Sequence, residues 1–139
     1  MVDQNCAYCV EGDLVAKFGI KICELETSKV YLFKEQSHPG RCIVAHKKHV
    51  GDMNELTAEE RAAYFEDVAR VARAIMKAFN PDKVNYGAYG DTGHHLHFHL
   101  CPKYKDEYEW GGVFLMNPDK KYLTDEEYAD MIEKIKANL

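Results

Sequence analysis

The 139-residue chain lacks several features that would place it in a specialised class of proteins. It has no apolar run near the ~20 residues that cross a bilayer. Residues 1–5 lack the basic and then apolar order of a signal peptide. Lysine and arginine number 18 against 23 acidic residues, a net charge of −5, which argues against a basic surface for nucleic acid. We therefore expect a cytoplasmic protein with no membrane or nucleic-acid partner.

The cysteine content is also informative, because five thiols are an odd number and no secretory signal accompanies them. A disulfide framework is therefore not expected, and reduced thiols or metal ligands are favoured. Cys6 and Cys9 form a Cys-x-x-Cys pair, which suits half a zinc site, a redox pair or two unrelated thiols. A zinc site would need two more ligands, which histidines brought in by the fold could supply. The remaining cysteines, Cys23, Cys42 and Cys101, are expected in strands as small core residues.

What the chain does contain is enough apolar sequence, 46% of all residues, for one core, so we expect a single domain over residues 1–139. Capping boxes beginning at Thr57 and Thr124 predict a long helix that ends before Asn80-Pro81 and a short C-terminal helix. Glycine-rich sequence over 87–93 predicts a turn, and 104–122 a long loop. Short β-prone runs predict strands over 19–25, 29–33, 42–45 and 83–86.

The most unusual stretch is residues 94–101, which holds four of the seven histidines. His95, His97 and His99 alternate with apolar residues, and a strand has a side-chain period of two. Such a strand would bury its apolar face and turn three imidazoles toward a cleft or a metal site. Imidazole is a nucleophile, an acid or base, or a metal ligand near neutral pH.

The pattern His95-x-His97-x-His99 resembles the signature of the histidine triad (HIT) superfamily. Further segments resemble other HIT blocks in the correct order: the Cys6-x-x-Cys9 pair of zinc-containing bacterial members, residues 39–49, Asn85-x-Gly87 with 90–92, and Trp110. The resemblance covers roughly residues 6 to 115. It implies an α+β fold with a five-stranded antiparallel sheet, one long helix and a C-terminal helix, and a homodimer.

The same resemblance implies roles for individual residues. His97 would be the nucleophile that forms a nucleotidyl-histidine, and His99 would contact phosphate and assist proton transfer. Substrate contacts would come from residues of the turn before the triad, from the preceding strand and from the loop after it, namely Asn85, Gly90, Asp91, Thr92 and Trp110. The reaction implied is nucleotide hydrolysis or nucleotidyl transfer at the α-phosphate of a purine nucleoside phosphoramidate or a dinucleoside polyphosphate, such as diadenosine tetraphosphate.

The resemblance also implies a structural zinc ion bound by Cys6, Cys9, His49 and His95. Two thiolates and two imidazoles make a closed tetrahedral site with no position for water. The alternative is a metal-free Cys-x-x-Cys with both histidines hydrogen-bonded in the core.

Three positions depart from the family pattern or match it incompletely. Asp91 stands where glutamine is usual, and a carboxylate beside phosphate is unfavourable. Arg41 replaces a histidine and could face a phosphate or be solvated, and Glu35 is the nearest candidate for the ribose-binding acid. Asp91 favours a second hypothesis, a zinc-stabilised nucleotide-binding module with little catalysis. A third hypothesis is a metal-dependent enzyme that uses His97 and His99 as ligands.

Overall fold

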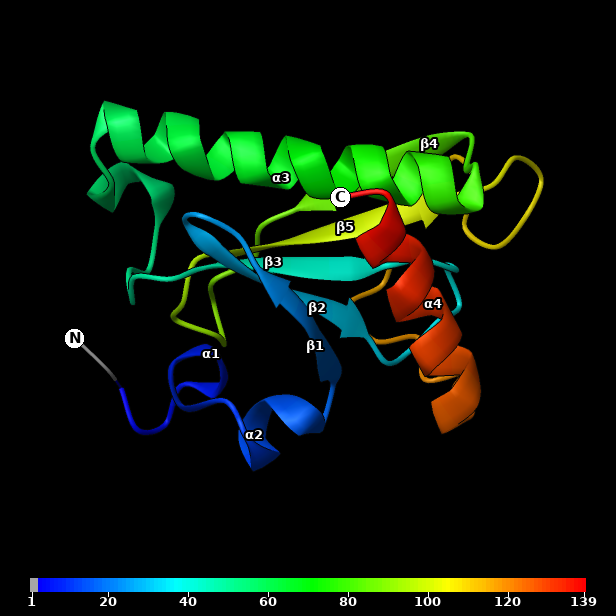
Figure 1. The fold of residues 1–139 in the computed structure, drawn as a ribbon, viewed down its shortest axis with the longest axis horizontal. Coiled ribbons are helices and arrows are strands. Elements are labelled where there is room, and N and C mark those ends of the chain that lie inside the picture. Colours follow the sequence, from blue (N-terminus) through cyan, green and yellow to red (C-terminus); the bar gives the residue numbers. More distant parts are fainter. Residues whose placement is uncertain (1–2) are drawn as a thin grey trace.

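The computed structural model describes residues 3–139 as one antiparallel sheet covered by helices on both faces. The strands lie in the order β1-β2-β3-β5-β4, so that β1 and β4 form the two edges (Figure 1). All four neighbouring pairs are antiparallel. Their bounds are β1 Gly19–Glu24, β2 Ser28–Phe33, β3 Cys42–His46, β4 Lys83–Gly87 and β5 His97–Lys103.

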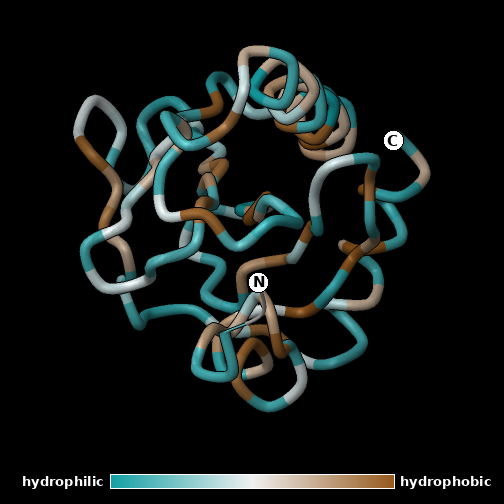
Figure 2. Tube along the Cα trace, turned by 90° about the vertical axis from the view of Figure 1, so that its left-hand side faces the viewer, coloured by the Kyte–Doolittle hydropathy of each residue, from teal (hydrophilic) through white to brown (hydrophobic). Residues whose placement is uncertain are grey.

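The long helix α3, Ala58–Phe79, packs on one face of the sheet together with α4, Asp125–Ala137. Thr57 accepts a hydrogen bond from the backbone of Glu60 and so begins α3, while Asn80 ends it in the left-handed conformation. Hydrophobic residues gather on the side of α3 that faces the rest of the chain (Figure 2). The Asp67 carboxylate accepts bonds from Thr27 and Ser28, which fixes the helix to the β1–β2 turn.

The N-terminal helices α1 (Ala7–Val10) and α2 (Asp13–Ala16) cover the opposite face, where a second, smaller apolar cluster lies (Figure 1). Strand periodicity separates the two faces. Val44 and Phe98 are paired across β3 and β5 and belong to the α3 cluster. Their neighbours pair as Ile43 with His99 and Ala45 with His97, so the two histidines lie on the face of α1.

The predicted α+β fold, both capping boxes and five strands are confirmed, with one correction. The histidine strand was expected to include His95, but β5 begins at His97. Hydrogen bonds of the preceding backbone explain the difference, because the His95 amide donates to the Gly93 carbonyl in a turn and the Leu96 amide donates to Val50. The four-residue helices α1 and α2 and the 3-10 helix η1, Met53–Glu55, were not expected. None of the described helices combines the length and apolar character needed to cross a bilayer.

Candidate functional site

A cleft of about 960 Å³ lies on the sheet face that carries the histidines. This volume is within the ~300–1,000 Å³ typical of small-molecule sites. The wall combines triad imidazoles, aromatic rings and the turn that precedes β5. It includes Tyr8, Phe18, Phe33, Asp91, Thr92, His97, His99, Phe114 and Met116.

His97 is held with one ring nitrogen occupied. Its Nδ1 lies 2.6 Å from the carbonyl oxygen of His95, and a carbonyl can only accept, so Nδ1 carries the proton and donates. Tyr8 from α1 packs against the ring with centroids 5.0 Å apart. Burial lowers the pKa of His97 below its usual value, which favours neutral imidazole with a lone pair on Nε2. The arrangement is that of a nucleophile or a metal ligand.

His99, two residues further on, has a different partner. The side chain of Arg41 approaches its Nδ1, with Nη2 at 3.0 Å and Nε at 3.3 Å. The rings of Phe33 and Phe114 also contact it. Burial, and then the positive charge of Arg41, lowers the pKa of His99 to about 2. His99 is therefore neutral at physiological pH.

Next to His97, four side chains converge as expected for a metal site. The ligand atoms of Cys6, Cys9, His49 and His95 all lie within 4.8 Å of one another. The His95 Nδ1 lies 3.3 Å from the Cys6 sulfur, 3.6 Å from the Cys9 sulfur and 3.2 Å from the His49 Nδ1. A tetrahedral zinc ion, with sulfur at about 2.3 Å and nitrogen at about 2.0 Å, separates its ligand atoms by roughly 3.3–3.8 Å.

The surroundings of His95 fit the same ion. Its Nε2 lies 2.6 Å from the backbone carbonyl of His46, so Nε2 donates and Nδ1 keeps a lone pair toward the cysteines. Such an outer hydrogen bond is the usual support of a metal-bound imidazole. Burial lowers the pKa of His95 to about 4, so the ring is in the neutral form that a metal requires. The donor set therefore fits zinc. Its four protein ligands would leave no open coordination position for a substrate.

The residues expected to bind substrate are only partly brought together. Asp91 and Thr92 line the cleft beside the triad. Asn85 lies half-buried on β4 opposite Cys101, and Gly90 and Trp110 are exposed; none of the three is among the lining residues found.

Sequence reasoning missed Tyr8 and Phe114 and left the surroundings of Arg41 and Glu35 open. Tyr8 and Phe114 cover the imidazoles, and Arg41 is fully buried behind His99 rather than solvated. The available signal for Arg41 was a charged residue directly before the mostly apolar strand β3. Glu35, the nearest candidate for the ribose-binding acid, is buried on the wall of the cleft and accepts hydrogen bonds from Ser37, Lys120 and Lys121.

A family model for the HIT domain matches residues 19–106. The chain belongs to the HIT domain family. The match covers the sheet, α3 and the triad, whereas Cys6 and Cys9 precede it.

Individual relatives agree with this assignment. The chain is 29% identical over 116 residues to the adenosine 5'-monophosphoramidase hnt1 of Schizosaccharomyces pombe, covering 77% of this chain and 80% of that protein. A histidine triad protein of Sinorhizobium meliloti has the same fold, with a TM-score of 0.84, 23% identity, and coverage of 92% and 95%. A zinc-bound histidine triad protein of Mycobacterium smegmatis has a TM-score of 0.68 at 21% identity, with coverage of 95% and 93%.

Proposed function

We propose that this HIT domain hydrolyses or transfers nucleotides at the α-phosphate through a nucleotidyl-His97 intermediate. The observation that carries the proposal is the hydrogen bond from His97 Nδ1 to the His95 carbonyl, which leaves Nε2 as a free lone pair at the cleft. A nucleotide phosphoramidase among the relatives supports the substrate class. The substrates proposed are purine nucleoside phosphoramidates and dinucleoside polyphosphates.

The geometry suggests how the two half-reactions would proceed. His97 Nε2 attacks the α-phosphorus and the bond from phosphorus to the leaving group breaks. Its electron pair stays on the departing phosphate oxygen, or on an amine nitrogen that takes up a proton from solvent. The His95 carbonyl stabilises the resulting imidazolium through the retained Nδ1–H. Water then attacks phosphorus, its proton passes to solvent, and the electron pair of the phosphorus–nitrogen bond returns to Nε2. His99 and Thr92, both on the cleft wall, would donate hydrogen bonds to the phosphoryl oxygens.

We further propose that the Cys6, Cys9, His49 and His95 group holds a structural zinc ion. When bound, the ion would supply a cross-link between α1, the segment after β3 and the start of the triad. That cross-link would position Tyr8 against His97. It would also keep the His95 carbonyl within hydrogen-bond distance of His97 Nδ1. The relative from Mycobacterium smegmatis supports zinc as the metal.

The experiment is a rapid quench of the protein with a nucleotide substrate followed by intact-mass measurement. We expect an acid-labile, base-stable adduct of nucleotide mass that maps to His97. His97→Ala should lose turnover and the adduct but still bind nucleotide, whereas His99→Ala should lose roughly 10²–10⁴-fold in rate. Full activity of His97→Ala, or an adduct on another residue, would refute the mechanism. Nucleotide binding without any turnover in the unmutated protein would instead favour the binding-module hypothesis that Asp91 suggests.

A homodimer is proposed with this function, because β4 is an open sheet edge beside α3. Tyr86 on β4 and Met76 on α3 are both more than two-fifths exposed and line a shared groove. Isologous contact of two such edges would bury both residues and continue the sheet.

A further inference from the structure

We infer that Arg41 is a positioning residue that holds His99 as a neutral Nε2–H donor, and that the site therefore favours leaving groups that depart as oxyanions over amines. The second half of this inference rests on the proposed nucleotidyl transfer. The first half stands on the geometry of the Arg41 side chain alone.

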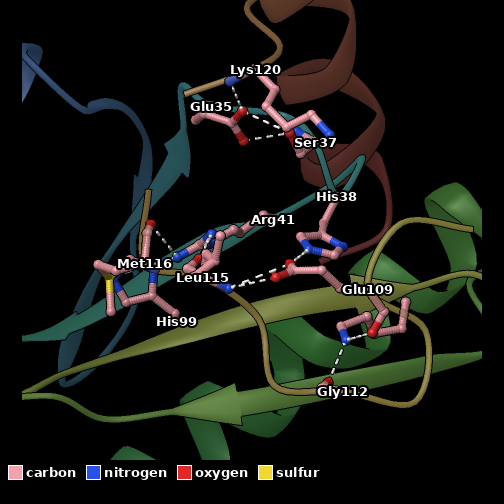
Figure 3. Close-up of polar contacts among 11 residues, drawn as sticks. Glu35, Ser37, His38, Arg41, His99, Glu109, Gly112, Leu115, Met116 and Lys120 are labelled. Carbon is pink, nitrogen blue, oxygen red and sulfur yellow. Dashed lines mark hydrogen bonds and ion pairs between the residues drawn. The ribbon is translucent and has the colours of Figure 1, made fainter. Parts of the chain in front are cut away.

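Arg41 is fully buried, and the partners of its guanidinium group all line the cleft. Besides His99, Nη1 donates to the Leu115 carbonyl at 3.0 Å and Nη2 donates to the Met116 carbonyl at 2.9 Å. The group lies 4.2 Å from the Phe33 ring centroid. Figure 3 shows Arg41 between His99 and the loop residues Leu115 and Met116. The guanidinium group is thus fixed on several sides.

The chemistry of arginine then decides the tautomer of His99. Guanidinium has five donors and no acceptor, so Nδ1 of His99 must present a lone pair to it. Neutral His99 consequently carries its proton on Nε2. His97 has the opposite tautomer, because its Nδ1 faces a carbonyl. Two neighbouring imidazoles therefore offer complementary Nε2 atoms, a lone pair from His97 and a donor from His99.

The charge around His99 also opposes its protonation. None of the ion pairs found among residues 3–139 involves Arg41. The nearby carboxylates have other partners: Glu35 binds Ser37 and Lys120, and Glu109 binds His38 and the Leu115 amide (Figure 3).

The other groups beside the His99 ring bring no negative charge. His97 becomes cationic on nucleotidyl transfer, Phe33 and Phe114 are apolar, and burial raises the pKa of the Cys101 thiol to about 12. An imidazolium at His99 would lose its hydrogen bond from Arg41 and face two positive charges.

A donor that cannot act as an acid restricts the leaving group. When a phosphorus–oxygen bond of a polyphosphate breaks, the electron pair remains on a phosphate oxygen whose pKa is about 6, and no proton is needed. When a phosphorus–nitrogen bond breaks, the amine nitrogen must receive a proton, and general acids that do this have a pKa near the working pH. Neutral His99 can stabilise charge on oxygen but cannot supply that proton. We therefore expect dinucleoside polyphosphates to be better substrates than alkyl phosphoramidates.

Arg41 also anchors the 104–122 loop, so a purely structural role needs a control. Lys103 provides it, because its buried Nζ donates to the carbonyls of Glu109 and Gly112 in the same loop and has no hydrogen bond to His99. Lys103→Met would loosen the loop without changing the charge or donor at His99. Arg41→His would remove the permanent charge, and Arg41→Lys would keep the charge but lose the fork of donors.

The first test is histidine-selective ¹⁵N NMR of the zinc-loaded, unmutated protein, with His99 assigned by the signals lost in His99→Gln. We expect His99 as the Nε2–H tautomer and unprotonated at pH 6, and His97 as the Nδ1–H tautomer. A His99 proton on Nδ1, or an imidazolium at pH 6, would overturn the inference. This NMR measurement does not require the protein to turn over a substrate, and it does not depend on an Arg41 variant that folds.

The second test compares kcat/KM for diadenosine tetraphosphate and for an adenosine 5′-phosphoramidate of a primary alkylamine. We expect the unmutated protein to prefer the polyphosphate by roughly 100-fold or more, the size of a missing general acid. Arg41→His should narrow this ratio about tenfold or more, while Lys103→Met should leave the ratio unchanged even if both rates fall. Equal activity on both substrates, or the same narrowing in Lys103→Met, would overturn the leaving-group claim. If neither substrate is turned over, the proposed function and the leaving-group claim fail together, and the NMR result still decides the role of Arg41.

Discussion

The buried His99 imidazole makes the stability of the fold depend on pH. In the unfolded chain His99 should titrate at its ordinary value of 6.5, whereas burial and Arg41 lower its pKa in the folded protein to about 2. Between these values the unfolded state binds the proton and the folded state does not. The contribution of His99 to the free energy of unfolding is therefore fully present above pH 6.5 and is lost as the pH falls below that value.

The size of the effect follows from the unfolded value alone, provided that the folded pKa lies well below the test pH. When the pH is lowered from 7.5 to 5.0, the last ~1.5 pH units lie below the unfolded pKa of His99. At about 1.36 kcal/mol per pH unit, the free energy of unfolding falls by about 2 kcal/mol. His99 is only 3% exposed, so solvent screening does not reduce this figure much. His99→Gln removes the titration while its amide oxygen can still accept from Arg41.

Urea unfolding at both pH values, for the unmutated protein and His99→Gln, measures the difference directly. The loss between pH 7.5 and 5.0 should be about 2 kcal/mol smaller in His99→Gln. Release of zinc and titration of the other histidines should affect both proteins alike and cancel in the comparison. An equal pH dependence of the two proteins would refute a neutral, buried His99.

Three further predictions concern the rest of the fold. Freshly purified protein should contain about one zinc ion per chain by elemental analysis, and Cys6→Ala/Cys9→Ala should lose the metal and unfold at a lower temperature; metal-free protein at neutral pH would contradict the site. Asp67→Ala should lower the free energy of unfolding by about 2–4 kcal/mol in urea titrations, because Asp67 Oδ2 accepts three hydrogen bonds of 2.7 to 2.9 Å near the β1–β2 turn. The protein should sediment as a dimer of 16.0 kDa chains, and Tyr86→Glu should weaken it; a stable monomer at micromolar concentration would rule the dimer out.

The sequence was sufficient for the elements whose signals are local and strong. Thr57 and Thr124 cap the starts of their helices as expected. A capping box is defined by four consecutive residues, so the sequence alone reveals it. The face that His97 and His99 share follows from strand periodicity. The start of β5 could not be predicted in the same way, since His95 continues the alternation in the sequence while its amide bonds within a turn.

The N-terminal region shows a different limit. Helices of four residues such as α1 have no periodicity to detect, and α1 is held in place by its environment. Tyr8 lies between the two cysteines of the metal group and packs against both His95 and His97. The Cys-x-x-Cys pair predicted ligands, but nothing in it indicated that Tyr8, between the two cysteines, would cover His97.

Arg41 marks the clearest gap between sequence and structure. Its sequence position allowed a phosphate contact or a solvated side chain, whereas the structure buries it, with a ring nitrogen and the carbonyls of Leu115 and Met116 as its partners. Backbone carbonyls of a loop leave no signature in a sequence, so these contacts required the three-dimensional arrangement. The difference matters because histidine can give or accept a proton, whereas arginine only donates. One residue outside the triad thereby limits His99 to donating a hydrogen bond, while the triad pattern itself is unchanged.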